Sequence, residues 1–331
     1  MASPSSFLGI DAGGSKTQVL LVDPEGNEQA QATGGPANHQ GQNWASGIDA
    51  LFNTISQAFT AFQSQFSYPP TITRSCLGLA GLDTPSDLHE LEATLRRHQN
   101  AATYFGPSLI AVNDAYVGFK SGSQSPWGIA IIAGTGTNCY GVTATGTTYS
   151  VGSWGYLLGD QASGFALGQA IAQAVMSEYD GRDSPSALTP AVLDFLHLNH
   201  PTDFYTWVYQ HPHPVAALAS LAPLVALPAL AQHPVIVSCL NRSRSILIYN
   251  YQTLLTRMNL DPTSTFDLVL LGGLFSLEAQ FLEPLTQALT ALTPTAHIFH
   301  PVRSPVWGAA DLARSWKSGE LLPELALTLN L

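Results

Sequence analysis

The sequence predicts an α/β fold built from two domains with a cleft between them. A tight glycine-rich turn between apolar, strand-like runs occurs twice, at 7–23 and at 128–142. After each turn the predicted elements follow the same order, strands and then helices. The chain has 331 residues, which is too long for one typical compact core. These observations indicate that one α/β unit is present twice.

The elements of the first half follow from local patterns. Residues 7–34 predict a hairpin and a third strand, with a turn at Pro24-Glu25-Gly26-Asn27. Apolar residues spaced by three and four predict an amphipathic helix over 43–66. The remaining predictions are a strand at 71–79, a helix at 87–99 and a short buried strand at 109–112.

The second half repeats this order. It is predicted as a hairpin at 128–150, a glycine-rich loop at 152–164, a helix at 164–179, helical segments between proline-containing turns over 187–259, strands at 266–271 and 296–299, and a helix at 304–317. We expect the last helix to pack back on the first domain. The predicted domains are therefore 1–117, completed by about 304–331, and 118–303.

Composition excludes several classes of function. The net charge is −11 and no run of Lys or Arg occurs, so a nucleic-acid surface is not expected. The apolar stretch 215–231 is short for a membrane span and contains two prolines, which favours a buried helical segment. Three widely separated cysteines fit neither a disulfide framework nor a zinc site. With no signal-like N-terminal region, we expect a cytoplasmic protein.

The first glycine turn follows Asp11 and reads Gly13, Gly14, Ser15, Lys16 and Thr17. Without bulky side chains, such a turn lets backbone N–H groups approach a phosphate, and its hydroxyls add donors. It is not a P-loop, because Ser15 separates Gly14 from Lys16 and a strand follows where a helix is required. An ordinary hairpin with a solvated aspartate is the alternative.

The second turn reads Gly134, Thr135, Gly136 and Thr137. Both turns resemble the phosphate loops of the actin/hexokinase/Hsp70 superfamily. That resemblance implies that Asp11 holds Mg²⁺ and that Asp114, at a strand end, is the catalytic carboxylate. A helix N-cap is the alternative role for Asp114.

A longer segment carries a more specific resemblance. Residues 152–165 read Gly-Ser-Trp-Gly-Tyr-Leu-Leu-Gly-Asp-Gln-Ala-Ser-Gly-Phe, similar to a Gly-Gly-Trp-Gly…Gly-Asp-Glu-Gly-Ser segment of the N-acetylglucosamine kinase and BadF/BadG/BcrA/BcrD ATPase family. Further motifs follow in the family's order: Gly-Pro-Ala-Asn-His at 35–39, Leu-Ala-Gly-Leu at 79–82, Leu-Gly-Gly-Leu-Phe-Ser at 271–276 and Pro-Val-Trp-Gly-Ala-Ala at 305–310. They extend from residue 7 to about 313, nearly the whole chain.

The resemblance implies two ribonuclease H-like (actin-type ATPase) domains, an ATP site and a sugar site in an interdomain cleft. The implied ATP-binding residues are Gly13, Gly14, Ser15, Lys16, Thr17, Gly134, Thr135, Gly136, Thr137, Gly272 and Gly273. The implied sugar-binding residues are Asn38, Asp114, Trp154, Gly155 and Asp160. The resemblance further implies ATP and Mg²⁺ as cofactors and a homodimer.

The expected function is ATP-dependent phosphorylation of an amino sugar, by resemblance at the C6 hydroxyl of N-acetylglucosamine. Gln161 and Ala162 replace the family's Glu-Gly, so N-acetylmuramic acid and glucosamine stay open as substrates. Two alternatives belong to other classes. One is an ATPase that activates a redox partner, which would need a pair of cluster-binding cysteines. The other is a sugar sensor without catalysis.

Overall fold

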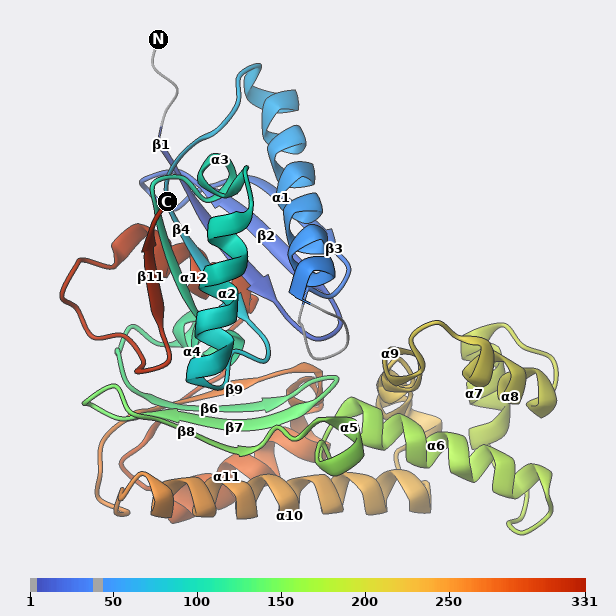
Figure 1. Ribbon diagram of the computed structural model, residues 1–331. Helices are drawn as coiled ribbons and strands as arrows, with labels where there is room; N and C mark the ends of the chain where they lie inside the picture. Colours follow the sequence, from blue (N-terminus) through green and yellow to red (C-terminus); the bar gives the residue numbers. More distant parts are fainter. Residues whose placement is uncertain (1–4, 38–43) are drawn as a thin grey trace.

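The computed structural model describes residues 5–37 and 44–331 and contains two β-sheets (Figure 1). The first sheet has six strands in the order β11-β5-β4-β1-β2-β3, and the second has five in the order β10-β9-β6-β7-β8. Because the two sheets carry the two glycine turns, the predicted duplication of an α/β unit is confirmed.

The first half forms the elements that local patterns predict, with small shifts at their ends. Its strands are β1 (Ser5–Ala12), β2 (Thr17–Val22), β3 (Glu28–Gly34), β4 (Thr71–Leu79) and β5 (Ser108–Asn113). Its helices are α1 (Trp44–Phe66), α2 (Pro85–Arg97), α3 (Ala101–Phe105) and α4 (Asp114–Gly122). Helix α2 begins two residues before the predicted start, because Thr84 and Asp87 form a reciprocal capping box around Pro85.

The second half forms the same order of strands and a larger set of helices. Its strands are β6 (Gly128–Ala133), β7 (Thr137–Val142), β8 (Thr148–Gly152), β9 (Asp267–Leu271) and β10 (His297–Phe299). Its helices are α5 (Gly155–Leu158), α6 (Gly164–Tyr179), α7 (Leu188–Leu196), α8 (Pro201–Gln210), α9 (Pro214–Ala219), α10 (Pro234–Arg257) and α11 (Glu283–Leu292). A π-helical turn, Glu278–Leu282, leads into α11, and α12 (Pro305–Ser315) and β11 (Leu327–Asn330) close the chain.

Strand pairing shows how the two halves correspond. β1, β2 and β3 form an antiparallel meander, and β4 and then β5 add in parallel on the β1 side. β6, β7 and β8 form the matching meander, to which β9 and then β10 add in parallel on the β6 side. In both sheets the carboxyl ends of the parallel strands therefore point toward one edge, where ligands of open α/β sheets bind.

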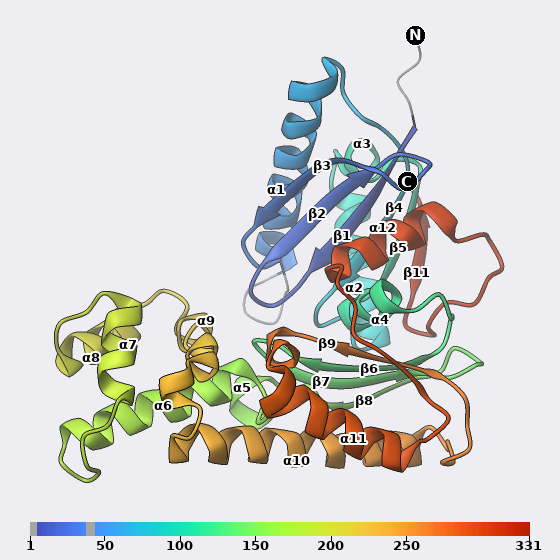
Figure 2. The ribbon, with the colours of Figure 1, turned by 180° about the vertical axis from the view of Figure 1, so that it is seen from behind.

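Helices cover both faces of the first sheet. Along β2, Val19 and Leu21 pack in the core with α1 and α2, whereas Leu20 and Val22 pack against α12. This alternation places successive side chains on opposite faces, as expected for a strand buried on both sides. Figure 2 shows α1 and α12 on opposite sides of the sheet.

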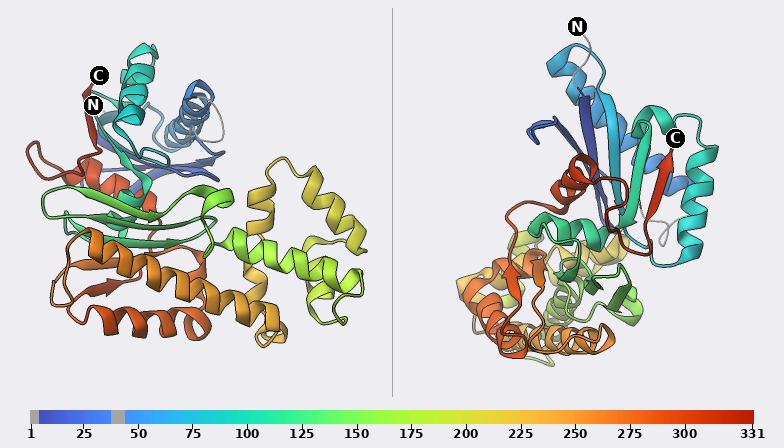
Figure 3. Two further views of the ribbon diagram at one scale, coloured as in Figure 1. Left: turned by 60° about the horizontal axis from the view of Figure 1, so that its bottom comes forward. Right: turned by 90° about the vertical axis from the view of Figure 1, so that its left-hand side faces the viewer.

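A third core joins the two sheets. It contains Val112 and Tyr116 from the first half, Ala130 and Val269 from the second sheet, and Ala309 from α12. Helices α4 and α12 therefore lie between the sheets, as the views in Figure 3 also show. The expectation that the last helix packs back on the first sheet is confirmed, because α12 packs against β1, β2 and β4.

Segment 215–231 is helical and partly buried, as expected, but it is divided into short pieces. It contains α9 and two short 3₁₀ turns, Ala222–Ala226 and Pro228–Leu230, because Pro223 and Pro228 cannot donate backbone hydrogen bonds within a helix. Leu221, Leu224 and Leu230 are nevertheless buried. Within residues 5–37 and 44–331, no helix has the length and apolar character needed to span a membrane.

The end of the chain adds a strand that the sequence patterns did not predict. β11 pairs antiparallel with β5, from Leu327 opposite Ala111 to Asn330 opposite Ser108. The C-terminal residues thus extend the first sheet. The completion of the first domain by about 304–331 stays a prediction. The boundary near residue 117 stays a prediction and falls within α4.

Candidate active site

Two carboxylates lie at the edge of the first sheet where its parallel strands end. Asp11 is the penultimate residue of β1, and Asp114 directly follows β5 as the first residue of α4. Leu79, at the end of β4, pairs with Ala12 on one side and with Asn113 on the other. Two residues about 100 positions apart are therefore brought to the same edge of one sheet.

The surroundings of these carboxylates favour their protonated forms. Burial, together with the negative charges of Asp11 and Asp83, raises the pKa of Asp114 to about 7. Burial also raises the pKa of Asp11 to about 6, and the nearby Lys16 ammonium opposes that shift. A carboxyl group with a pKa near neutrality is suited to accept a proton during a reaction.

Asn113, not Asp114, caps helix α4. Its Oδ1 accepts a hydrogen bond of 2.9 Å from the backbone N–H of Ala115. Its Nδ2 donates to Asp83 Oδ1 over 2.8 Å. The N-cap role that was the alternative for Asp114 therefore belongs to its neighbour.

Asn113 and Asp83 were not among the predicted site residues. Asp83 lies just after the Leu-Ala-Gly-Leu motif that follows β4, and Asn113 directly precedes a helix. An amide or carboxylate at such a strand end is the signal that could have found them.

The first glycine turn connects β1 and β2. The backbone N–H of Gly13 donates to the carbonyl of Lys16 over 3.0 Å, while Gly14 and Ser15 are exposed. The side chain of Thr17 is buried, and its Oγ1 has no hydrogen-bond partner among the residues that the structure describes.

The second glycine turn connects β6 and β7 in a similar way. The N–H of Gly134 donates to the carbonyl of Gly136 over 3.0 Å. Thr137 is buried, and its Oγ1 also lacks a partner in the described part of the chain. Each turn thus ends in a buried hydroxyl without a partner, a costly arrangement in the absence of a ligand that completes the hydrogen bond.

Asp160 holds the second turn in place. Its Oδ1 accepts a hydrogen bond of 2.8 Å from the backbone N–H of Thr137, and burial raises its pKa. Its own backbone has a positive φ of 54°. The cap of helix α6 is Ser163, whose Oγ accepts from Ala166 N–H over 3.1 Å, so Asp160 does not cap that helix.

Gly272 allows β9 to approach the second turn closely. A Cβ at this position would lie 2.3 Å from the carbonyl oxygen of Ala133 and 2.7 Å from the nitrogen of Gly134, and its φ is 120°. Gly273 follows at the start of a 3₁₀ turn, where an added Cβ would meet no atom within 4 Å. The Gly272-Gly273 segment therefore lies beside the second turn.

Trp154 and Gly155 lie on the surface beside these elements. Trp154 is 71% exposed, so it is not a buried anchor of its loop. Gly155 has a positive φ of 73° and begins the short helix α5. Asn38, the remaining predicted sugar-binding residue, lies outside the described residues.

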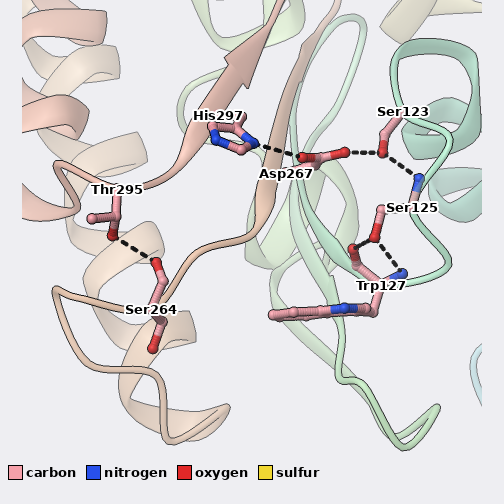
Figure 4. A network of polar contacts seen from close by, with 7 residues as sticks. All are labelled: Ser123, Ser125, Trp127, Ser264, Asp267, Thr295 and His297. Carbon is pink, nitrogen blue, oxygen red and sulfur yellow. Dashed lines mark hydrogen bonds and ion pairs between the residues drawn. The ribbon is translucent and has the colours of Figure 1, made fainter.

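A polar network anchors the far end of the helix that begins at Asp114. Ser123, the C-cap of α4, donates a short hydrogen bond through Oγ to Asp267 at the start of β9. The other oxygen of Asp267 lies 3.4 Å from Nδ1 of His297 on β10 (Figure 4). Helix α4 is thus fixed to the first sheet at its N-terminus and to the second sheet at its C-terminus.

The described residues contain no cluster of three or more His, Cys, Asp or Glu side chains that could hold a metal ion. One carboxylate, Asp11, stands beside the first turn. Mg²⁺ is commonly bound by one or two carboxylates together with phosphate oxygens and water. The residues present therefore fit a magnesium ion that is bound jointly with a polyphosphate.

Comparisons with known proteins agree with this geometry. The model of the BadF/BadG/BcrA/BcrD ATPase family matches residues 8–313. The chain is 28% identical over 324 residues to N-acetyl-D-glucosamine kinase from Dictyostelium discoideum, covering 95% of this chain and 99% of that protein. It is 29% identical over 218 residues to N-acetylmuramic acid/N-acetylglucosamine kinase from Clostridium acetobutylicum, covering 66% and 69%.

A solved structure extends the similarity to the whole fold. The structure of a candidate N-acetylglucosamine kinase from Chromobacterium violaceum has a TM-score of 0.72 and 27% identity, covering 94% of this chain and 99% of that chain. This match confirms the predicted fold class, since the similarity extends over both sheets and the helices between them.

Proposed function

Because the chain belongs to the BadF/BadG/BcrA/BcrD ATPase family, we propose that it is an ATP-dependent kinase that phosphorylates a hydroxyl group of an amino sugar. N-acetylglucosamine is the first candidate substrate, in line with the names of the relatives. C6 is the acceptor position that the family resemblance implies. The observation that carries the proposal is Asp114, a buried carboxyl group with a pKa of about 7 at the sheet edge beside the first glycine turn.

The two glycine turns are the proposed binding site for the phosphates of ATP. The buried hydroxyls of Thr17 and Thr137 would donate to phosphate oxygens and so gain the partners they lack in the described chain. Lys16, at the end of the first turn, would add a positive charge. Gly272 and Gly273 would lie near the adenosine, since they flank the second turn.

Asp11 is the proposed ligand of Mg²⁺. It is a hard oxygen donor beside the first turn, and burial disfavours its charge when no cation is near. When bound, the ion would neutralise part of the charge that develops on the transferring phosphoryl group. A bound cation would also favour the ionised form of Asp114.

Asp114 is the proposed general base. Its ionised carboxylate accepts the proton of the sugar hydroxyl as that oxygen forms a bond to the γ-phosphorus of ATP. The bond between the γ-phosphorus and the β–γ bridging oxygen breaks, and ADP leaves with that oxygen. The network through Ser123 and Asp267 fixes the other end of α4 and therefore helps to hold Asp114 in position.

The proposed sugar site combines Asp114, Trp154, Gly155 and Asp160 with Asn38. Carboxylate and amide groups can form paired hydrogen bonds with vicinal hydroxyls, and an exposed indole can pack on the apolar face of a pyranose. Asp160 Oδ1 already accepts a hydrogen bond from the N–H of Thr137. A sugar hydroxyl bonded to Asp160 Oδ2 would therefore be linked to the second glycine turn through Asp160.

An assay of ADP release tests the proposal directly. Purified protein with Mg·ATP would be offered N-acetylglucosamine, N-acetylmannosamine, N-acetylmuramic acid, glucosamine and glucose in turn. We expect turnover with one amino sugar and a loss of about 10²–10⁴-fold in kcat for Asp114→Asn. Asp180→Asn, an exposed carboxylate paired with Arg182, is the matched control and should retain activity.

The same assay separates the two alternatives. ATP hydrolysis that does not depend on sugar would favour the ATPase that activates a redox partner. That alternative finds little support in the cysteines, since Cys139 is buried in β7 and Cys239 lies on α10. Sugar binding without turnover would favour the sensor.

We also propose a cytoplasmic location, supported by the free thiols of all three cysteines. A homodimer stays a prediction from the resemblance. Sedimentation or gel filtration of the purified chain tests it, and a single monomeric species would contradict it.

A further inference from the structure

A second concave site lies where α5, α6 and α10 meet. It is a cavity of about 280 Å³, and residues 156–161, which include most of α5, form one of its walls. Gln169 and Gln173 line it from one face of α6, and Cys239 and Arg242 line it from one face of α10. Figure 1 shows α6 starting beside the short helix α5 and α10 running below both. Asp160 of the proposed sugar site lines it, whereas Asp11, Asp114, Thr17 and Thr137 do not.

Arg242 places an exposed guanidinium at this cavity, and no carboxylate of the described residues forms an ion pair with it. Within residues 5–37 and 44–331, its guanidinium makes no hydrogen bond and no ion pair. The other arginines of α10 are engaged: Arg244 donates to the carbonyl of Gln280, and Arg257 donates to the carbonyl of Ser150 over 2.6 Å. Asp160 is the other charged residue of the lining, and its Oδ1 is already bonded to Thr137.

Three glutamines add neutral hydrogen-bonding groups around the cation. Gln161, Gln169 and Gln173 line the cavity with exposed side chains, and no side-chain amide among the three forms a hydrogen bond within the described part of the chain. Phe165 and Leu167 provide apolar surface at the same place. A guanidinium fits carboxylate and phosphate oxygens through paired bonds, and amides bond to hydroxyls both as donors and as acceptors.

We propose that this cavity is a binding site for an anionic sugar, a hexose-sized molecule that carries a carboxylate or a phosphate monoester. Arg242 pairs with the anionic group, and the glutamine amides bond to ring hydroxyls. Gln161 fits this role because a neutral side chain leaves the charge of Arg242 available to the ligand. The cavity volume lies close to the lower end of ligand pockets, which begins near ~300 Å³.

A ligand bound in this cavity affects the proposed active site through the loop 156–161. The wall that the ligand touches, residues 156–161, includes Asp160, which holds the second glycine turn through Thr137. A ligand that favours one position of this loop therefore changes the affinity for ATP, and ATP changes the affinity for the ligand by the same factor. This coupling rests on the proposed kinase function, whereas the binding step does not.

Cys239 provides a direct measurement of binding. It lines the cavity and is half-buried, whereas Cys76 and Cys139 are fully buried. Burial raises the pKa of all three thiols, and the charge of Arg242 opposes that shift at Cys239. The rate of iodoacetamide labelling at Cys239 would be measured by mass spectrometry without ATP. The probes are glucosamine 6-phosphate, N-acetylmuramic acid, inorganic phosphate and neutral N-acetylglucosamine.

We expect one of the two anionic sugars to slow labelling of Cys239, with an apparent affinity that falls about ten- to a hundredfold in Arg242→Gln. Arg182→Gln removes the same charge at an exposed pair with Asp180 and should leave the affinity unchanged. Protection by the sugar phosphate identifies a site for a phosphorylated sugar, and protection by N-acetylmuramic acid identifies a site for a sugar acid.

Three results would overturn the proposal: no protection by either anionic sugar at millimolar concentration, equal protection in Arg242→Gln, or equal protection by inorganic phosphate or by N-acetylglucosamine. Turnover of a neutral amino sugar should be the same in Arg242→Gln as in the wild type. A protein that shows turnover but no protection therefore contradicts only this inference, and one that shows protection but no turnover contradicts only the kinase proposal.

Discussion

Asp114 is subject to opposite demands from stability and from the proposed chemistry. The folded protein favours the neutral carboxyl group, because burial and two neighbouring carboxylates raise its pKa to about 7. The proposed reaction requires the ionised form, which accepts a proton from the sugar. A residue of this kind is expected at an active site, where function is maintained at some cost in stability.

The first prediction at this scale concerns stability. The pKa of Asp114 rises from 3.8 to about 7 on folding, so its stabilising protonated form is lost as pH increases through about 7. Asp114→Asn cannot ionise and should be more stable than the wild type at pH 8 by roughly 2–4 kcal/mol. Below pH 4 the two proteins should be equally stable. Urea unfolding at both pH values measures this, and a variant less stable at pH 8 would contradict it.

The second prediction concerns the pH dependence of the reaction. Only the ionised fraction of Asp114 can act as base, so kcat/KM should rise about tenfold per pH unit below about pH 7 and level off above it. Initial rates at low sugar concentration, with ATP binding measured separately over the same range, test this expectation. Because a bound cation lowers this pKa, only a profile that also stays flat well below neutrality would exclude Asp114 as the base.

At the scale of elements, the two glycine turns most clearly indicate a bound ligand. Each is closed by a hydrogen bond of 3.0 Å within the turn and followed by a buried threonine whose hydroxyl has no partner in the described chain. A protein gains little stability from such a hydroxyl, so its presence is better explained by a bound group than by packing.

Replacing these hydroxyls should therefore separate binding from stability. Thr17→Val and Thr137→Val should each raise the KM for ATP about tenfold, because a hydrogen bond to a charged phosphate is lost. Their thermal stability should stay the same or increase. The control is Thr54→Val in α1, a buried threonine whose Oγ1 donates to Ala50 over 2.9 Å. Thr54→Val should lose stability and keep the KM for ATP. If Thr17→Val and Thr137→Val instead lost stability and kept the KM for ATP, the phosphate site would be contradicted.

At the scale of the whole molecule, α12 joins the parts that the reaction needs. It packs on β1, which carries Asp11, and on α4, which begins with Asp114. Contact is possible only because glycines lie at both surfaces. A Cβ at Gly9 would lie 2.4 Å from the nitrogen of Ala310, and a Cβ at Gly308 would lie 2.0 Å from the carbonyl oxygen of Val117.

Gly308→Ala should disturb both stability and activity. The added methyl meets backbone atoms of α4, which cannot rotate away, so we expect a loss of about 1–3 kcal/mol or more. Because α4 carries Asp114, kcat should fall even in the fraction that remains folded. Gly273→Ala, which adds a methyl in open space, is the control for stability. Urea unfolding and ADP release on the same samples measure both effects. Unchanged values would show that α12 can shift away from α4 with no loss of stability or activity.

Much of the secondary structure, including both glycine turns, could be predicted because it depends on short sequence segments. Apolar spacing along 43–66 predicted α1 almost to the residue, and both glycine turns were recognised between their strands. Such patterns act locally, since helical and strand periodicity depends on neighbours within a few residues. The order of motifs then identified the family, which the match over residues 8–313 shows.

Other features depend on residues far apart in the chain. Nothing near Leu327 indicated that β11 would extend the first sheet beside β5, because that strand exists only through its partner. The bond from Thr137 to Asp160 and the cap that Asn113 supplies next to Asp83 also needed the folded chain. The cavity around Arg242 joins lining residues of two helices, such as Gln173 and Cys239, that lie more than 60 positions apart in sequence.

The sequence by itself thus determined the duplicated α/β order, the two glycine turns and the identity of the carboxylates. Only the tertiary structure decided that Asp114 is buried near the charges of Asp11 and Asp83, and that its pKa is therefore about 7. The physical reason is that residue types and periodicities are properties of short segments. Burial and the distance between charges are set by the packing of segments against one another.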